Sequence, residues 1–325
     1  MTVPFAYVRP RSVAAAISSA ADERAAIHAG GTDLLGCLRD GVYTVETVVS
    51  LADIEGLAGV RERKDGGLAI GAMTTITALA EDPTVAGRYP GLAQAAAAVA
   101  SPQLRHQGTV GGNLCQKPRC WYYRGDFPCL RKGGYKCFAV NGENQHHAIL
   151  GGAPCFIVHP SDLAPALMAL DAAVIIDGPD GTRRVAVADL HVAPADNPTR
   201  ETVLEAGEII TEVRIPAPPA GLYNSYRKIR TRRSWDFAIA GCALALTLDD
   251  DTVREARVVL AAAAPVPWRA TAAEEVLRGN PLDDAHIRDA ADAAMADAVP
   301  MTHNAYKVPL FKGMLQEELA KARPR

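Results

Sequence analysis

Five of the chain's seven cysteines lie between Cys115 and Cys155, and this cluster is the strongest constraint that the sequence places on the fold. A segment with paired glycines, residues 101–114, precedes the cluster, and a polar segment, residues 158–167, follows it. An odd number of clustered cysteines is not the pattern of a disulfide framework, and it favours metal binding by reduced thiols. The sequence therefore predicts a metal centre beside a glycine-rich loop, in a reducing compartment such as the cytoplasm.

The spacing of four of these cysteines bears on which metal they bind. Eight, seven and seventeen residues separate Cys120, Cys129, Cys137 and Cys155, and none of these gaps is the short C-x2–4-C spacing of structural zinc sites. Wide spacing in a loop suits an iron–sulfur cubane, whose corners point apart. Ligand type alone does not fix the metal, so zinc stays open. Six basic residues in the same loop would offset thiolate and cluster charge: Lys117, Arg119, Arg124, Arg131, Lys132 and Lys136.

The remaining cysteines and the loop histidines are expected to have structural roles. Cys115 directly follows the glycine segment and is predicted to pack beneath it. Cys37 and Cys242 lie in apolar surroundings and are predicted to be small buried residues. His146 and His147 are adjacent in a loop, which is typical of surface residues rather than ligands.

Two glycine pairs are candidates for binding a phosphate. Gly30-Gly-Thr-Asp33 follows a predicted strand, residues 25–29, and precedes a predicted helix that begins at Leu34. This arrangement presents free backbone N–H groups and the positive end of a helix to an anion. A tight turn that needs a positive φ is the competing interpretation, because glycine adopts such a φ without strain. Thr109-Val-Gly-Gly-Asn113 is predicted to be a second glycine turn.

Changes in pattern predict an α+β protein of three domains. Residues 1–58 carry alternating helix and strand signals, and residues 59–215 add further strands around a cysteine insert, residues 115–155. Pro216–Ala220 contains three prolines and is a predicted hinge. Residues 221–325 have the pattern of three strands followed by three helices.

Hydrophobic periodicity and turn residues predict the individual elements. Helices are expected over residues 14–21 (with Ser12 as N-cap), 34–38, 75–79, 91–100, 166–171, 272–277, 284–298 and 304–322. Strands are expected over residues 25–29, 45–51, 68–72, 172–176, 185–189, 209–215, 223–229, 238–248 and 253–262.

Several classes of protein receive no support from the sequence. A net charge of −3 gives no electrostatic case for nucleic acid or an anionic membrane as partner. No apolar stretch reaches the ~18 residues of a membrane span, and the N-terminus lacks the basic and apolar regions of a signal peptide. Neither a G-x-G-x-x-G fingerprint after a strand nor a Walker loop is present, which removes the main support for a doubly wound dinucleotide fold.

Four segments, in the same order along the chain, resemble the FAD-binding medium subunit of the molybdenum hydroxylases, the xanthine dehydrogenase family. They are Ala29–Leu35, Ser101–Leu114, Pro160–Ala172 and Tyr226–Ala238. The cysteine insert resembles two branches of that family that carry an additional [4Fe-4S] cluster, namely bacterial aldehyde oxidoreductases of the periplasmic type and 4-hydroxybenzoyl-CoA reductase. The segment Gly142–Gly151 is more similar to the aldehyde oxidoreductase branch.

The resemblance implies a fold and a set of site residues. The implied fold is the two-subdomain FAD-binding fold of the PCMH, or vanillyl-alcohol-oxidase-like, type, followed by the small C-terminal α+β domain. The first glycine loop would hold the FAD diphosphate by backbone amides, and the second would contact the diphosphate and approach the flavin ring. Implied cofactor-binding residues are Ile27, His28, Ala29, Gly30, Gly31, Thr32, Asp33, Leu34, Leu35, Ser101, Thr109, Gly111, Gly112, Asn113, Asp162 and Lys228. Implied cluster ligands are Cys120, Cys129, Cys137 and Cys155, with Cys115 left out.

Two of the implied residues carry charge. Asp162 aligns with a position near the adenosine ribose, where a carboxylate accepts hydroxyl hydrogen bonds. Lys228 aligns with a basic position beside the isoalloxazine edge, where a cation would stabilise reduced, anionic flavin. A solvated lysine in a basic run is the alternative for Lys228.

The resemblance also implies the function and the partners. The chain would be an electron-transfer subunit that works with a molybdenum-cofactor large subunit, where an aldehyde is oxidised, and a small subunit with two [2Fe-2S] clusters. Electrons would reach the FAD and leave to an external acceptor, and no residue of this chain would act as acid, base or nucleophile. Two alternatives are a medium subunit like that of 4-hydroxybenzoyl-CoA reductase, and a zinc-stabilised binding module without redox chemistry.

Overall fold

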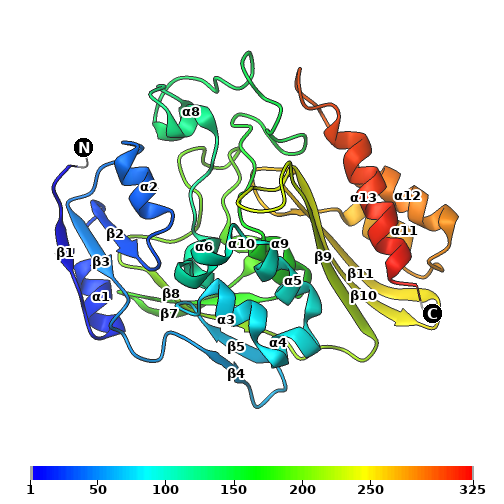
Figure 1. Ribbon diagram of the computed structural model, residues 1–325, viewed down its shortest axis with the longest axis horizontal. Coiled ribbons are helices and arrows are strands. Elements are labelled where there is room, and N and C mark those ends of the chain that lie inside the picture. Colours follow the sequence, from blue (N-terminus) through cyan, green and yellow to red (C-terminus); the bar gives the residue numbers. More distant parts are fainter. Residues whose placement is uncertain (1–2, 324–325) are drawn as a thin grey trace.

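The computed structural model describes residues 3–323 and builds them around three β-sheets (Figure 1). Residues 1–2 and 324–325, at the outer ends of the first and third predicted domains, lie outside the described range. Helices and mainly antiparallel strands are mixed along the chain, so the predicted α+β class is confirmed. No helix within residues 3–323 is long and apolar enough to cross a membrane.

The N-terminal sheet is small and parallel, in the order β1-β3-β2. Ser12 caps its first helix by accepting a hydrogen bond from the Ala15 N–H at 3.2 Å, as the sequence predicts. The first glycine pair lies between β2 and α2, also as predicted. The elements are β1 (Ala6–Val8), α1 (Val13–Ser19), β2 (Ala25–His28), α2 (Leu34–Arg39) and β3 (Thr47–Ser50).

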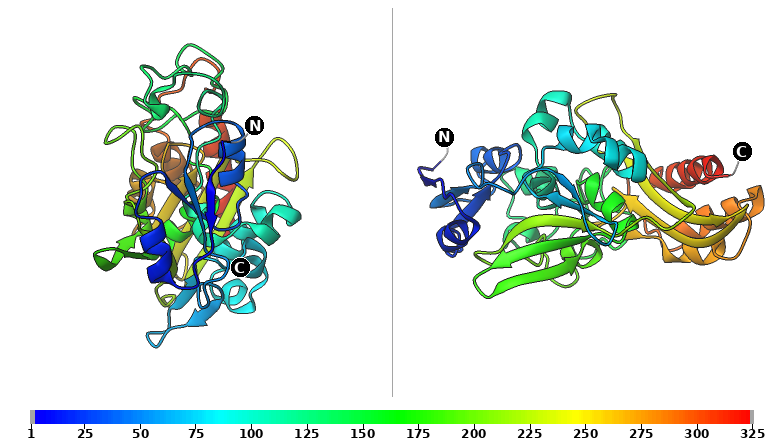
Figure 2. Two further views of the ribbon diagram at one scale, coloured as in Figure 1. Left: turned by 90° about the vertical axis from the view of Figure 1, so that its left-hand side faces the viewer. Right: turned by 90° about the horizontal axis from the view of Figure 1, so that it is seen from below.

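The central sheet has five strands in the order β4-β5-β8-β6-β7, all pairs antiparallel. Its strands are β4 (Val60–Glu62), β5 (Leu68–Gly71), β6 (Ala173–Gly178), β7 (Gly181–Ala186) and β8 (Ile209–Ile215). The chain between β5 and β6 folds into short helices, which Figure 2 shows gathered on one side of the sheet. Proline starts three of them, where its missing N–H is not needed. The helices around this sheet are α3 (Ile76–Glu81), α4 (Pro83–Arg88), α5 (Pro90–Ala98), α6 (Pro102–Gln107), α7 (Val110–Leu114), α9 (Leu163–Ala169) and α10 (Val187–Leu190).

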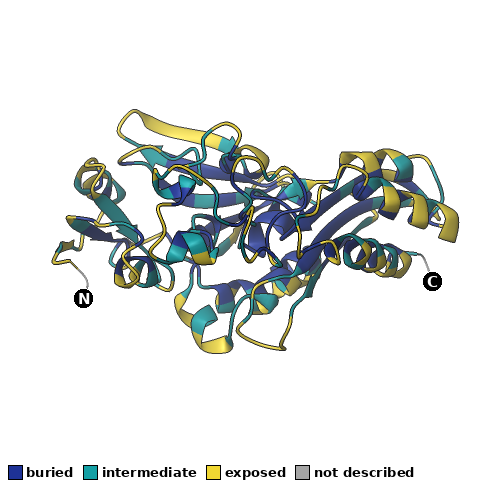
Figure 3. Ribbon diagram, turned by 90° about the horizontal axis from the view of Figure 1, so that it is seen from above, coloured by how far each residue is buried: buried dark blue, intermediate teal, exposed yellow. Residues whose placement is uncertain are grey.

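The C-terminal sheet is antiparallel, in the order β12-β11-β10-β9, with three helices against it. Its elements are β9 (Leu222–Ile229), β10 (Ala240–Asp249), β11 (Thr252–Ala261), β12 (Trp268–Arg269), α11 (Thr271–Leu277), α12 (Asp284–Ala294) and α13 (Lys307–Lys321). In Figure 3 the long strands are buried and the outward faces of the helices are exposed. The three predicted helices are present, and the sheet has four strands rather than three because the two-residue β12 joins its edge.

Strand β10 separates two hydrophobic cores and contributes side chains to both. Its side chains alternate between opposite faces, as in any strand. Leu244 and Leu246 pack into the core under α11–α13, while Ala243 and Ala245 pack into the core of the central sheet. The C-terminal unit is therefore joined to the rest of the protein by apolar packing through its own sheet.

Two predicted elements are wrong. Residues 185–189 were predicted to be a strand, but β7 ends at Ala186 and a helical turn, α10, follows it. The second glycine pair is not a turn but part of a short helix, α7, because Thr109 caps it and accepts the Gly112 N–H at 3.2 Å. A side-chain cap can start a helix even where two glycines lower its intrinsic propensity.

The cysteine insert is a long loop that contains only α8 (Trp121–Arg124) and the 3-10 turn η1 (Leu130–Lys132). In Figure 1 it rises between the N-terminal sheet and the C-terminal helices. Its last part is fastened to the C-terminal unit by Asn304, whose side-chain amide donates to the carbonyls of His147 and Ala148. Lys307, fully buried, also donates to the His147 carbonyl, at 3.1 Å.

Candidate cofactor-binding site

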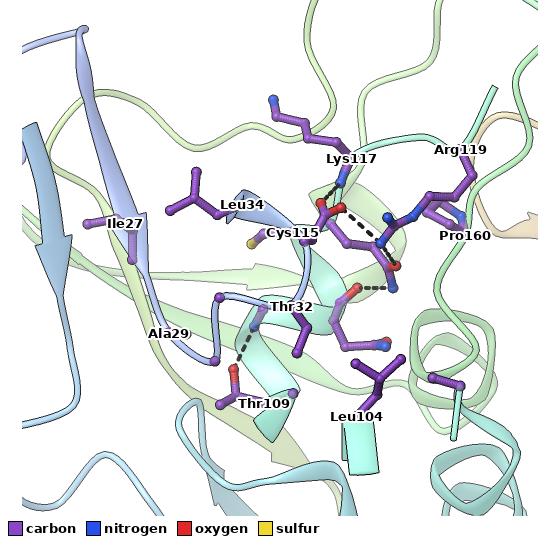
Figure 4. A pocket seen from close by; sticks show the side chains of 18 of the residues that line it. Ile27, Ala29, Thr32, Leu34, Leu104, Thr109, Cys115, Lys117, Arg119 and Pro160 are labelled. Atoms are coloured by element: carbon purple, nitrogen blue, oxygen red, sulfur yellow. Dashed lines mark hydrogen bonds and ion pairs between the residues drawn. The ribbon is translucent and has the colours of Figure 1, made fainter. Parts of the chain in front are cut away.

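A cavity of about 620 Å³ lies where the two glycine motifs meet (Figure 4). The loop between β2 and α2 forms one side, and the segment from α6 to Lys117 forms the other. Thr32 and Thr109, one from each motif, face the same space in Figure 4. The fold therefore brings together two segments that are almost eighty residues apart in the sequence.

The first glycine pair has no room for side chains. A Cβ on Gly30 would lie 1.9 Å from the Gln107 carbonyl oxygen, so this loop is pressed against the end of α6. Gly31 has a φ of +71°, which favours glycine. The tight turn is therefore present, and it leaves bare backbone lining the cavity, while phosphate binding by this backbone stays a prediction.

The second glycine pair lets helix α7 lie close to the central sheet. A Cβ on Gly111 would lie 3.0 Å from the Ala72 Cβ, whereas Gly112 faces the cavity. The Ser161 hydroxyl donates to the Asn113 side-chain oxygen at 2.5 Å, which ties α7 to the segment that precedes α9. Bare backbone on both sides of the cavity is the surface that a diphosphate requires.

A buried ion pair forms another part of the cavity wall. Lys228 Nζ lies 2.7 Å from Asp162 Oδ2, and their side chains are 3% and 5% exposed. The Tyr226 hydroxyl donates to the other Asp162 oxygen at 2.6 Å, and burial together with that carboxylate raises the pKa of Tyr226. Lys228 is therefore not the solvated lysine of the alternative interpretation.

Most of the predicted cofactor-binding residues line this cavity. They are Ile27, Ala29, Gly30, Gly31, Thr32, Asp33, Leu34, Thr109, Gly112, Asn113, Asp162 and Lys228. The other four do not line it: His28, Leu35, Ser101 and Gly111. Ser101 instead caps α6, and Leu35 is half exposed.

Several residues that line the cavity are not among the predicted cofactor-binding residues. Trp235 and Phe237, both exposed aromatics, reach it from the loop between β9 and β10. Arg119, next to Cys120, reaches it from the cysteine insert. Trp235 and Phe237 lie in a segment that carries the family resemblance, so that resemblance could have indicated a place at the cofactor site. No feature of the sequence around Arg119 indicates that its side chain reaches the cavity. Cys115 also lines the cavity, just after α7.

Three of the four predicted cluster ligands lie near one another. Burial raises the pKa of Cys120 to about 12, and the neighbouring Cys155 and Cys137 thiols add to the increase. Burial also raises the pKa of Cys155, against the opposing effect of the Arg131 guanidinium. Cys129 is buried in a small apolar cluster that Cys120 also joins. Coordination would deprotonate these thiols, because a bound metal competes with the proton.

The cysteines do not form a site for a single metal ion. Within residues 3–323, no three His, Cys, Asp or Glu side chains lie close enough together to hold one ion. The ligands of one zinc ion converge on a point, while the thiolates of a cubane bind separate iron atoms. The identity of a metal centre at Cys120, Cys129, Cys137 and Cys155 therefore stays a prediction.

The predictions for the other thiols and for the histidines have different outcomes. Cys37 and Cys242 are completely buried, as predicted, and burial raises the pKa of Cys37 to about 11. His146 is exposed, but the prediction for His147 is wrong, because that residue is buried beneath Asn304. His147 Nε2 lies 3.3 Å from Cys120 Sγ, and burial lowers the pKa of His147 to about 4.

Comparison with known proteins identifies the class to which this fold and cavity belong. The model of the FAD binding domain in molybdopterin dehydrogenase matches residues 3–218, and that of the CO dehydrogenase flavoprotein C-terminal domain matches residues 224–322. The chain belongs to this family, the FAD-binding subunits of the molybdenum hydroxylases. It is thus a subunit of an oxidoreductase of the aldehyde and xanthine dehydrogenase family.

Individual relatives match along almost the whole chain. The aldehyde oxidoreductase FAD-binding subunit PaoB of Escherichia coli K12 is 37% identical over 326 residues, which cover 98% of each chain. The carbon monoxide dehydrogenase medium chain of Afipia carboxidovorans is 30% identical over 328 residues, 99% of this chain and 97% of that one. A solved structure of carbon monoxide dehydrogenase from Hydrogenophaga pseudoflava superposes with a TM-score of 0.79 at 28% identity over all of both chains.

The cavity fits the FAD that the family requires. The backbone at Gly30, Gly31 and Gly112 is bare, and residues from several separate segments of the chain line the cavity. A buried side-chain donor, Arg119 Nε, has no hydrogen-bond partner among the described residues. Bound FAD would supply a two-electron carrier, and the residues of this chain hold and orient it.

Proposed function

We propose that the chain is the FAD- and [4Fe-4S]-carrying electron-transfer subunit of a heterotrimeric, molybdenum-dependent aldehyde oxidoreductase. In this role it passes electrons from a molybdenum-cofactor large subunit and a small subunit with two [2Fe-2S] clusters to an external acceptor. The similarity to PaoB, an aldehyde oxidoreductase subunit by name, supports the aldehyde as substrate class. Aldehyde oxidation takes place on the partner, and this chain contributes no acid, base or nucleophile.

The observation that carries the proposal is the junction between the cavity and the cysteine insert. Lys117 and Arg119 line the cavity, and Cys120 is the next residue. A smaller cavity of about 250 Å³ continues from Arg119 and Asp162 to Cys120 and His147. A cluster held by the insert would therefore lie beside the flavin, where it can exchange electrons with it or shift its potential by its charge.

Residues 27–35 supply the diphosphate cradle, and residues 109–113 face it from the opposite side. Asp162 and Lys228 hold each other at the cavity wall, where the ammonium group would offset negative charge on reduced flavin. Cys120, Cys129, Cys137 and Cys155 are the proposed ligands of the cluster. The wide spacing of these cysteines in the sequence is the feature that supports the cubane over zinc.

Analysis of the purified protein tests the proposal directly. Acid precipitation should release FAD rather than FMN, and iron analysis should give about four irons per chain. Release of neither flavin would refute the cradle, and a colourless protein that contains zinc would support the binding-module alternative. A potentiometric titration tests the other alternative, a medium subunit like that of 4-hydroxybenzoyl-CoA reductase. A very low reduction potential of the cluster would favour that role.

A further inference from the structure

The guanidinium of Arg119 is held in one orientation at the boundary between the two cavities. Its Nη2 lies 2.9 Å from Asp33 Oδ1 and donates to Gln116 Oε1 at 3.3 Å. Its Cζ lies 4.9 Å from the centre of the Phe237 ring, within the range of a cation–π contact. These contacts fix a side chain that would otherwise have many rotamers.

Arg119 keeps one donor free. Its Nε is buried and has no hydrogen-bond partner within the described part of the chain. Leaving a charged N–H group unsatisfied costs free energy, because water has been removed and nothing replaces it. The Arg119 side chain lines the larger cavity and is 31% exposed, so the outer part of its guanidinium is open to an acceptor that binds there.

The charge around Asp33 indicates which kind of acceptor this is. Asp33 Oδ1 accepts a hydrogen bond from Arg124 at 2.7 Å and forms an ion pair with Arg119 at 2.9 Å, while Oδ2 accepts the Lys117 N–H at 2.7 Å. One carboxylate therefore faces two guanidinium groups, which leaves one positive charge in excess. Among the other cations of the cavity wall, Lys228 is paired with Asp162, whereas the Lys117 ammonium shares Glu201 with Arg131 and adds to the positive charge of this region.

We infer that Arg119 binds the diphosphate of FAD directly, and that Asp33 acts as a positioning residue that holds the guanidinium in place. This inference rests on the proposed function and adds a residue of the cysteine insert to the FAD site. A carboxylate beside a diphosphate would repel it, so Asp33 contributes through Arg119 rather than by touching the cofactor. The insert then serves both cofactors, because one wall of the FAD cavity ends at Cys120.

Titration of FAD into the full-length protein, after its FAD has been removed, tests this inference through flavin fluorescence. Arg119→Met should raise the Kd for FAD at least about tenfold, the worth of one charge-assisted hydrogen bond. Arg119→Lys keeps the positive charge but lacks the planar guanidinium, and its Kd for FAD should lie between those of the wild type and Arg119→Met. Lys64→Met, a matched change at an exposed lysine between β4 and β5, should leave the Kd unchanged. Iron content is measured in every variant, so loss of the cluster is detected separately.

Asp33→Asn distinguishes direct binding from a purely structural role of Arg119. The amide keeps one oxygen that can accept from the guanidinium groups but replaces the other, which accepts the Lys117 N–H, with a donor; it also removes a negative charge, so the loss of FAD affinity should be smaller than in Arg119→Met. Equal losses of affinity in Asp33→Asn and Arg119→Met would overturn the inference, and so would an Arg119→Met Kd within threefold of the wild type. Wild-type protein that binds no FAD at all would instead overturn the proposed function.

Discussion

The ammonium group of Lys228 and the carboxylate of Asp162 form an ion pair 2.7 Å apart that is almost completely shielded from water. Lys228 also donates to the Ala98 carbonyl, at the end of α5, at 3.1 Å. The pair thereby joins β9 of the C-terminal unit to two segments of the central unit at the cavity wall. Apolar packing through β10 and polar contacts such as this pair together fix the position of β9 relative to the cavity.

Removing one member of this pair should destabilise the protein strongly. Lys228→Met leaves a buried carboxylate without its partner, and we expect a loss of about 3–5 kcal/mol in the free energy of unfolding. Lys312→Met is the matched control, because Lys312 forms a pair with Asp292 at 2.8 Å on the surface, and it should cost less than about 1 kcal/mol. Denaturant-induced unfolding measures the free energy of unfolding of both variants. Equal losses would show that the buried pair contributes no more to stability than the surface pair.

Gly30→Ala should disrupt the cavity through backbone contact. The new Cβ would lie 1.9 Å from the Gln107 carbonyl oxygen, so the two glycine motifs must separate. We expect a loss of about 1–3 kcal/mol in stability together with loss of bound FAD. Gly87→Ala is the control, because a Cβ there meets nothing within 4 Å, and in helix α4 it should stabilise by up to about 1 kcal/mol. Thermal unfolding and FAD content of both variants give the comparison.

Local patterns in the sequence predicted most of the elements that surround the cavity. The strand, glycine pair and helix start at residues 25–38 depend on neighbours in the chain, and the structure confirms them. The pattern of residues 238–248 likewise predicted a strand, observed as β10, although not that its opposite faces enter two different cores. The two-residue β12 and the helical turn α10 were missed, because each is too short to show a period.

Contacts between distant segments were beyond what the sequence could predict. His147 is buried because Asn304 and Lys307, about 160 residues later, cover it. Arg119 was expected to offset thiolate charge, yet its partner is Asp33, 86 positions earlier in the numbering. Each of these pairings depends on how the units pack, and no local composition signals it.

Replacing the cysteines one at a time tests the proposed ligand set. Cys129→Ser should remove the broad absorbance of about four irons while FAD stays bound. FAD should be retained because Arg124 and Arg119 anchor the start of the insert to Asp33 without any cysteine. Cys115→Ser, which changes a thiol outside the proposed set, should keep its iron. Iron loss from Cys115→Ser that equals the loss from Cys129→Ser, with none from Cys155→Ser, would show that the ligand choice is wrong.

The buried Lys307 should make stability depend on pH. Its ammonium group donates to the carbonyls of His147 and Ala262, and burial lowers the pKa of Lys307 from 10.5 to about 7. Between these values the unfolded chain binds a proton that the folded protein does not, so stability should rise with pH by about 1.4 kcal/mol per unit above pH 7. His146 and His147 face Lys307, and both have lowered pKa values, so they are neutral in this window.

The test compares Lys307→Met with the wild type across pH 7 to 9.5 by thermal unfolding. Methionine fills similar space without a titrating group, so the rise in stability with pH should disappear, while the loss of two hydrogen bonds lowers stability at the upper end. At pH 7 and below, the difference in stability between the variant and the wild type should be smaller. The reason is that the wild type must there keep an ammonium group buried without an acidic partner. A rise of the same slope in both proteins would assign the pH dependence to another group and would mean that the amine of Lys307 reaches water in the folded state.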